Sequence, residues 1–197
     1  VDGTYLNGFY ESMTIEYPEP AYGYAKKYQT MLNVPNGKII RVSVDGEELH
    51  LDTGTLNDFT RTLDMETGIL ERAFTWCSPS GREVTVTVKR LVSFTHPHAA
   101  AIAFTLTPKF SGRVKIVSQL DGNVENVSVE KDPRVGCHLK GRVLHPVSQT
   151  SPKTALLHTT KESGLMLVSA VDHQLMVGGV EQAGEVTCKA KDGRKTD

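Results

Sequence analysis

A strict alternation of apolar and polar residues limits most severely what this chain can fold into. Between Glu83 and Leu91, three valines alternate with polar residues, namely Val84, Val86 and Val88. Because successive side chains of a β-strand point to opposite faces of the sheet, this alternation predicts a strand with one apolar face. The same period predicts three further strands, over Lys38–Val44, Arg113–Ser118 and Asn126–Glu130.

Turn residues separate the apolar runs, and no long stretch carries a helical stripe. Asp45-Gly46 lies between two such runs and predicts a tight hairpin turn in which both central residues have positive φ. Two more continuously apolar segments, Ala100–Leu106 and Leu165–Val171, are interpreted as central strands covered on both faces. Many short strands without crossover helices predict an all-β fold, an antiparallel β-sandwich that occupies residues 1–197 as a single domain.

Composition excludes several classes of function. The formal net charge of -1 argues against nucleic acid as a main partner, since such proteins usually present a basic face. No apolar run approaches the roughly 20 residues that span a bilayer, so no membrane association is expected. The three cysteines (Cys77, Cys137 and Cys188) form no Cys-x-x-Cys pair and are interpreted as reduced, mostly buried thiols of a cytoplasmic protein.

His96 and His98 are the most conspicuous pair of metal-ligand residues. Two histidines placed two apart on a strand would share one face and could bind a metal ion. The proline between them, Pro97, favours a turn instead, and no third ligand lies nearby in the sequence. Neither a metal site nor a cofactor site is therefore predicted.

Four carboxylates gather around one predicted hairpin: Asp58, Asp64, Glu66 and Glu71. Paired carboxylates can act as acid and base on a glycosidic bond. The sequence does not show that any two of them face each other across a cleft. We favour a solvated hairpin, in which Arg61 and Arg72 are the ion partners of these carboxylates.

An aromatic segment supplies the candidate binding residues, which are Tyr22, Tyr24, Tyr28, Gln29 and Asn33. Tyrosine combines an apolar ring with a polar tip, and this combination suits the stacking of sugar rings. The same residues could equally pack against a second domain, and this interface interpretation is favoured. The single tryptophan, Trp76, is expected to fill the core.

Several short motifs follow one another in a fixed order: Gly8-Phe9-Tyr10-Glu11-Ser12, Tyr22-Gly23-Tyr24-Ala25, Leu32-Asn33-Val34-Pro35-Asn36-Gly37, Arg61-Thr62-Leu63-Asp64-Met65, Phe74-Thr75-Trp76 and Leu120-Asp121-Gly122-Asn123-Val124. Their order and spacing resemble the N-terminal domain of glycoside hydrolase family 65, especially its maltose phosphorylase-like members. The resemblance covers about residues 3 to 130 well and the remainder more loosely. It implies a large twisted β-sandwich of the galactose mutarotase-like type, a supersandwich, here truncated at both ends.

The resemblance also implies a function. In this family the catalytic glutamate and the phosphate-binding residues belong to an (α/α)6 barrel, and none of them matches a position in this chain. We therefore expect a non-catalytic domain of an inverting α-glucoside phosphorylase or hydrolase, whose substrate is a disaccharide such as maltose, trehalose or kojibiose. The expected partners are the barrel of the same parent protein, an α-linked disaccharide near the domain edge and a second copy in a homodimer. Inorganic phosphate is the expected co-substrate of the parent.

Two alternatives remain open. The chain could be a carbohydrate-binding module that uses the tyrosine segment. It could also be a free-standing aldose mutarotase or epimerase, which would need a histidine acid and a carboxylate base facing one cleft. No spacing selects such a pair from the histidines that we considered, which are His96, His98, His138, His145, His158 and His173.

Overall fold

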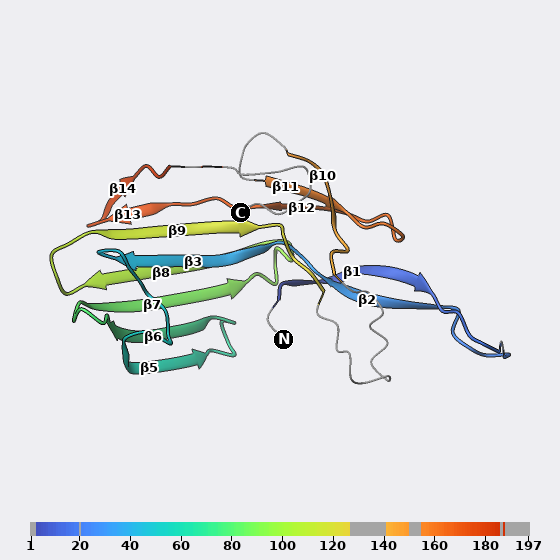
Figure 1. Cartoon of the computed structure of the whole chain (residues 1–197), viewed down its shortest axis with the longest axis horizontal. Helices are drawn as coiled ribbons and strands as arrows, with labels where there is room; N and C mark the ends of the chain where they lie inside the picture. Colours follow the sequence, from blue (N-terminus) through green and yellow to red (C-terminus); the bar gives the residue numbers. More distant parts are fainter. Residues whose placement is uncertain (1–2, 20, 127–140, 150–154, 186, 188–197) are drawn as a thin grey trace. The chain divides into compact units, whose positions relative to one another are not determined.

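The computed structural model describes residues 3–19, 21–126, 141–149, 155–185 and 187, in which fourteen β-strands and no helix occur. The prediction of an all-β antiparallel fold is confirmed (Figure 1). No helix in this part of the chain is long and apolar enough to cross a membrane. The chain divides into two compact units, one made of residues 40–118 and one made of the segments on either side. The single domain over 1–197 stays a prediction.

Two sheets lie wholly or mostly within the unit of residues 40–118. One has the strand order β5 (Thr55–Leu63), β6 (Leu70–Cys77), β7 (Glu83–Val92) and β8 (Ala100–Pro108), with neighbours antiparallel. The other has the order β4 (Glu47–Glu48), β3 (Asn36–Val44) and β9 (Val114–Asp121). Between the sheets lies a core of Val42, Val44, Phe74, Trp76, Val84, Val86 and Val88. The predicted apolar face of the valine row and the buried Trp76 are therefore confirmed.

The two segments interpreted as central strands lie at sheet edges instead. β8 is the last strand of its sheet, and alternate residues along it are exposed. β12 (Met166–Ala170) is likewise an edge strand, with Met166 and Val168 largely exposed. The apolar residues on the outer face of β8 are small alanines, such as Ala103. A continuous run of apolar letters therefore does not require cover on both faces.

The predicted hairpin turn is confirmed at Asp45-Gly46. Asp45 has a φ of 46° and Gly46 a φ of 93°, so both central residues take the left-handed conformation that this turn requires. Asparagine, aspartate and glycine tolerate this conformation better than other residues, which explains the sequence at this corner.

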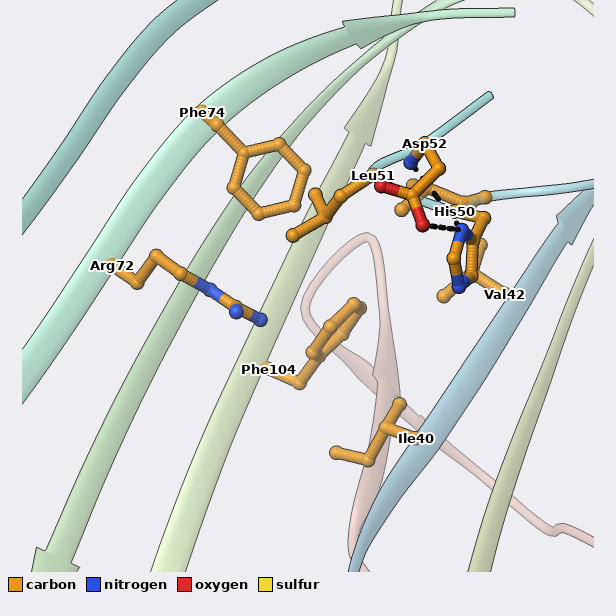
Figure 2. A pocket seen from close by; sticks show the side chains of 9 residues that line it. Ile40, Val42, His50, Leu51, Asp52, Arg72, Phe74 and Phe104 are labelled. Carbon is orange, nitrogen blue, oxygen red and sulfur yellow. Dashed lines mark hydrogen bonds and ion pairs between the residues drawn. The ribbon is translucent and has the colours of Figure 1, made fainter. Parts of the chain in front are cut away.

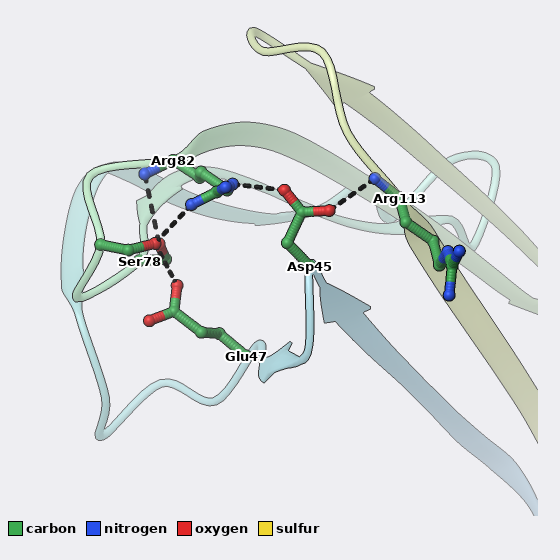
Figure 3. A network of polar contacts seen from close by, with 6 residues as sticks. Asp45, Glu47, Ser78, Arg82 and Arg113 are labelled. Atoms are coloured by element: carbon green, nitrogen blue, oxygen red, sulfur yellow. Dashed lines mark hydrogen bonds and ion pairs between the residues drawn. The ribbon is translucent and has the colours of Figure 1, made fainter.

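The Asp45 side chain is at the centre of a polar network that links three connections between strands (Figure 3). Its carboxylate accepts hydrogen bonds from Arg82 Nε at 2.5 Å and from the backbone N–H of Arg113 at 2.6 Å. The Arg113 backbone donor, followed by the Arg82 guanidinium, lowers the pKa of Asp45. Arg82 also donates to Ser80 Oγ, which in turn donates to Glu47. The turns after β3 and β6 and the connection into β9 are thus fixed by one polar network.

The other unit contains three small antiparallel groups of strands. β1 (Tyr5–Thr14) pairs with β2 (Lys27–Asn33), and β13 (Leu175–Val177) pairs with β14 (Val180–Gln182). β11 (Ala155–Thr159) lies between β10 (His145–Gln149) and β12. The core of this unit consists of Phe9, Leu32, Val34, Val143, Leu144 and Leu167. Most of the predicted strand over Asn126–Glu130 lies outside the described residues.

A buried carboxylate joins distant parts of this unit. Glu11 in β1 is 1% exposed and accepts backbone hydrogen bonds from Lys161, Glu162 and Ser163, which follow β11, at 2.6–3.1 Å. It also accepts one from the N–H of Ser12 at 3.0 Å. Burial alone would raise its pKa, but the backbone donors outweigh burial and lower the pKa of Glu11. Glu11 therefore remains ionised and fixes the loop after β11 on β1.

Candidate functional site

The two most exposed tyrosines of the described residues, Tyr22 and Tyr24, lie in the connection between β1 and β2. Tyr22 is fully exposed and Tyr24 is 54% exposed. The Tyr24 ring lies 4.9 Å from that of Tyr17, whose hydroxyl donates to the carbonyl of Ala25 at 3.0 Å. We call residues 15–26 the tyrosine loop. Its aromatic rings are accessible, as either a sugar contact or a domain interface would require.

The other residues of the predicted site are not equally accessible. Tyr28 is half-buried in β2 and donates its hydroxyl to the sulfur of Met13 at 3.3 Å. Gln29 is exposed. Asn33 accepts a hydrogen bond from the Thr4 N–H and donates from its side-chain nitrogen to the carbonyl of Glu125. The amide of Asn33 therefore holds the backbone together, whereas Tyr22, Tyr24 and Gln29 face solvent.

The turn at His96 and His98 is confirmed. The two rings lie 6.4 Å apart in the connection between β7 and β8, where the N–H of Ala99 donates to the carbonyl of His96. Nowhere in the described ranges do three residues of the metal-ligand types come together. Of the three cysteines, Cys77 is a free, half-buried thiol, and Cys137 and Cys188 lie outside the described residues.

The carboxylate hairpin is solvated, but its predicted ion partners are wrong. Glu71 pairs with Lys89, directly opposite on β7, at 3.3 Å, rather than with Arg61 or Arg72. The reason is the alternation of β6, which places Glu71 and its neighbour Arg72 on opposite faces of the sheet. The two arginines lie opposite one another, on the face of β6 that also carries Phe74.

Asp64, in the same hairpin, acts within its own turn. It accepts hydrogen bonds from the hydroxyl of Thr67 at 2.7 Å and from the N–H of Glu66 at 2.9 Å. The Thr67 hydroxyl, followed by the backbone donors of Glu66 and Thr67, lowers the pKa of Asp64. A carboxylate occupied in this way stabilises a turn, and it is poorly suited to act as a general acid.

A pocket opens between the two sheets of the 40–118 unit (Figure 2). Its volume is about 310 Å³, and most of its wall is apolar. Its polar groups are Arg72, His50 and Asp52, and Figure 2 shows the Arg72 guanidinium pointing toward the middle of the pocket. A mostly apolar cavity with a few convergent polar groups is the usual form of a small-molecule site. This pocket is therefore the candidate binding site of the unit.

His50 and Asp52 were missed by the sequence reasoning. His50 Nδ1 lies 3.4 Å from a carboxylate oxygen of Asp52 and accepts a hydrogen bond from the backbone N–H of Asp52. This is the combination of residue types that the mutarotase alternative needs. The two side chains contact each other, however, whereas the acid and base of that reaction must reach different atoms of the sugar. The only sequence signal that could have identified them is a histidine two residues before an aspartate in a predicted loop.

The histidines considered from sequence do not gather at this pocket. His145 and His173 are exposed, and His138 lies outside the described residues. His158 is 4% exposed in β11, and its Nδ1 has no hydrogen-bond partner in the described part of the chain. Burial, followed by the positive charge of Arg142, lowers the pKa of His158. His158 is therefore a neutral core residue at physiological pH.

Comparison with known proteins places this arrangement in a family. The family described as "Glycosyl hydrolase family 65, N-terminal domain" matches residues 1–196. An alpha,alpha-trehalose phosphorylase of Thermoanaerobacter brockii is 44% identical over 178 residues, which are 89% of this chain and 23% of that protein. An uncharacterised glycosyl hydrolase of Mycobacterium tuberculosis is 38% identical over 180 residues, covering 90% of this chain and 23% of that protein.

A solved structure shares the fold. It comes from the human microbiome and is provisionally named a kojibiose phosphorylase; its TM-score is 0.65 at 23% identity, over 81% of this chain and 20% of that chain. The chain thus spans about a quarter of the length of the curated relatives it matches. The resemblance noted in the sequence motifs is confirmed, and the chain belongs to glycosyl hydrolase family 65 as its N-terminal domain.

Proposed function

We propose that this chain is the non-catalytic N-terminal domain of a cytoplasmic α-glucoside phosphorylase, and that it packs on the catalytic barrel of the same polypeptide. There it helps to shape the catalytic cleft or the dimer interface. The main support is that 89% of the chain aligns with only 23% of a trehalose phosphorylase. The chemistry of such an enzyme then resides in the remaining three-quarters of the polypeptide.

The environment of the ionisable groups supports this assignment. Inverting cleavage of a glycosidic bond needs a carboxyl group that protonates the leaving oxygen, and hydrolysis needs a second carboxylate that activates water. Asp64 is occupied by its own turn, and Glu71 is paired with Lys89 on the outer face of the sheet. Glu11 is buried and saturated by backbone donors. None of these three carboxylates is placed to protonate a leaving oxygen.

The test is turnover by the purified 197-residue chain. The chain is incubated with phosphate and, separately, trehalose, kojibiose or maltose, and release of glucose 1-phosphate is measured. We expect none above the blank, whereas the longer protein that includes the barrel should release it from one of these sugars. A far-ultraviolet circular dichroism spectrum of the chain confirms that it is folded. Glucose 1-phosphate formation by the folded chain alone would overturn the proposal.

The exposed tyrosine loop favours a second candidate, a carbohydrate-binding function. Stacking of a sugar on the accessible rings of Tyr22 and Tyr24 predicts saturable chemical-shift changes when maltose is titrated into the chain at millimolar concentration. The double variant Tyr22→Ala, Tyr24→Ala should abolish them. Tyr5→Ala, which removes a 41% exposed tyrosine outside the loop, should leave them unchanged. A wild-type chain without saturable shifts would remove this candidate.

A further inference from the structure

Three arginines form a row on the inner face of the four-stranded sheet. Arg72 is two residues before Phe74 in β6, and Arg90 is two residues after Val88 in β7, so both continue the face that builds the core. Arg61 in β5 lies directly opposite Arg72. Arg90 lies diagonally across from Arg72, because Val88 pairs with Arg72. Long side chains at such positions are within reach of one another.

This row has no counter-charge in the described part of the chain. Arg61, Arg72 and Arg90 take part in no ion pair there. The guanidinium of Arg72 lies over the ring of Phe74 at 5.5 Å, a contact that uses none of its N–H donors. Its Nε is buried and has no hydrogen-bond partner among the described residues. Like charges on neighbouring strands and a buried unsatisfied donor both lower the stability of the fold. We therefore infer that the arginine row serves a function such as ligand binding.

Arg72 keeps its charge in this setting. Burial, followed by the positive charges of Arg90 and Arg61, lowers its pKa. Arginine is so strongly basic that the side chain stays a cation at every physiological pH even with this lowered pKa. The carboxylate of Asp52, which lines the same pocket, contacts His50 instead. The pocket thus presents one guanidinium without a partner among the described residues, and two further arginines lie on the neighbouring strands β5 and β7.

The shape of the pocket indicates the size of a ligand. At about 310 Å³ it lies near the lower end of small-molecule sites, roughly 300–1,000 Å³. Its wall includes the rings of Phe74 and Phe104 and the side chain of Ile40 (Figure 2). The pocket therefore has room for an apolar or ring-shaped part of a ligand, beside the anionic group that the arginine binds.

We propose that this pocket binds a small organic phosphate of about monosaccharide size, with its phosphate group on Arg72 and its body between Phe74 and Phe104. The forked guanidinium matches phosphate oxygens in a bidentate geometry. Three neighbouring cations complement a dianion better than a singly charged carboxylate. His50 and Asp52, on the pocket wall, are placed to exchange hydrogen bonds with hydroxyl groups of the body. This proposal does not depend on packing against a barrel.

Isothermal titration of the 197-residue chain at low salt tests the site, with glucose 6-phosphate as the probe and glucose as the uncharged control. We expect saturable binding of glucose 6-phosphate with a dissociation constant near or below about 1 mM, and none of glucose. Arg72→Gln should weaken binding at least tenfold. Arg41→Gln removes the same charge from an exposed position on the outer face of β3 and should change the affinity less than twofold.

The absence of saturable glucose 6-phosphate binding, or equal affinities of the Arg72→Gln and Arg41→Gln chains, would overturn the proposal. If Arg72→Gln does not fold, Arg90→Gln takes its place and should weaken binding three- to tenfold. In the wild-type chain, the probe should also shift the ring proton signals of Phe104 and His50. Binding that leaves both rings unshifted places the anion elsewhere and contradicts the assignment.

Discussion

Replacing Glu11 by alanine should lower the free energy of unfolding by about 3 kcal/mol or more, because several buried N–H groups lose a charged acceptor. The carboxylate is 1% exposed and accepts hydrogen bonds from the backbone of Lys161, Glu162 and Ser163. Alanine offers these donors no partner, and the cavity left behind adds to the loss. The loop after β11 should then separate from β1.

Urea unfolding followed by circular dichroism measures this loss. Glu16→Ala is the matched control, because Glu16 is an exposed carboxylate just beyond the same strand. Its free energy of unfolding should lie within about 0.5 kcal/mol of the wild-type value, as for most surface substitutions. Equal midpoints for the two variants would show that Glu11 does not anchor the loop.

The Glu11 contacts also predict a pH dependence. The pKa of Glu11 is lowered in the folded state from an ordinary value of 4.5. Its contribution to stability is therefore complete above pH 4.5 and is lost as the pH falls through the folded-state pKa, because the unfolded chain takes up the proton first. The Glu11→Gln chain should lose less stability than the wild-type chain over this acid range. Parallel stability curves for the two chains would contradict the assigned pKa.

Alternation predicted the strands and their buried faces well, but not the contacts between strands. The period of Val84, Val86 and Val88 determines which face of β7 is buried, whatever its neighbours are. The same rule already places Glu71 and Arg72 on opposite faces, yet the partner of each depends on the register between strands. Register is set by bulges such as the one between Asn57 and Thr60, which no short pattern in the sequence reveals.

The candidate pocket is harder still to predict, since its polar groups come from different elements. Arg72 comes from a strand, whereas His50 and Asp52 come from a loop whose position depends on packing. The contact between Glu11 and Lys161 joins residues 150 positions apart. Of these features, only the tyrosine loop consists of residues that are adjacent in the sequence. The exposure of Tyr22 and Tyr24 follows from their place in a polar, proline-containing connection.

Replacing Gly54 by alanine should destabilise the 40–118 unit by about 3 kcal/mol, since backbone strain and a steric clash act together. Gly54 has a φ of +73°, and a Cβ atom there would lie 2.2 Å from the carbonyl oxygen of Cys77. It would also lie 2.9 Å from Nε1 of Trp76, which donates to the carbonyl of Thr53 at 2.5 Å. A backbone carbonyl in a paired strand cannot move aside as a flexible side chain can.

Gly81→Ala separates the clash from the strain. Gly81 has a φ of +84°, but no atom lies within 4 Å of the added Cβ, so only strain of about 1 kcal/mol is expected. Urea unfolding gives both values, and the fluorescence of Trp76 reports the local effect. In Gly54→Ala its emission should shift to longer wavelength, because the clash displaces a fully buried ring whose N–H is bonded to Thr53. Equal losses in the two variants would mean that the close approach at Gly54 does not constrain the fold.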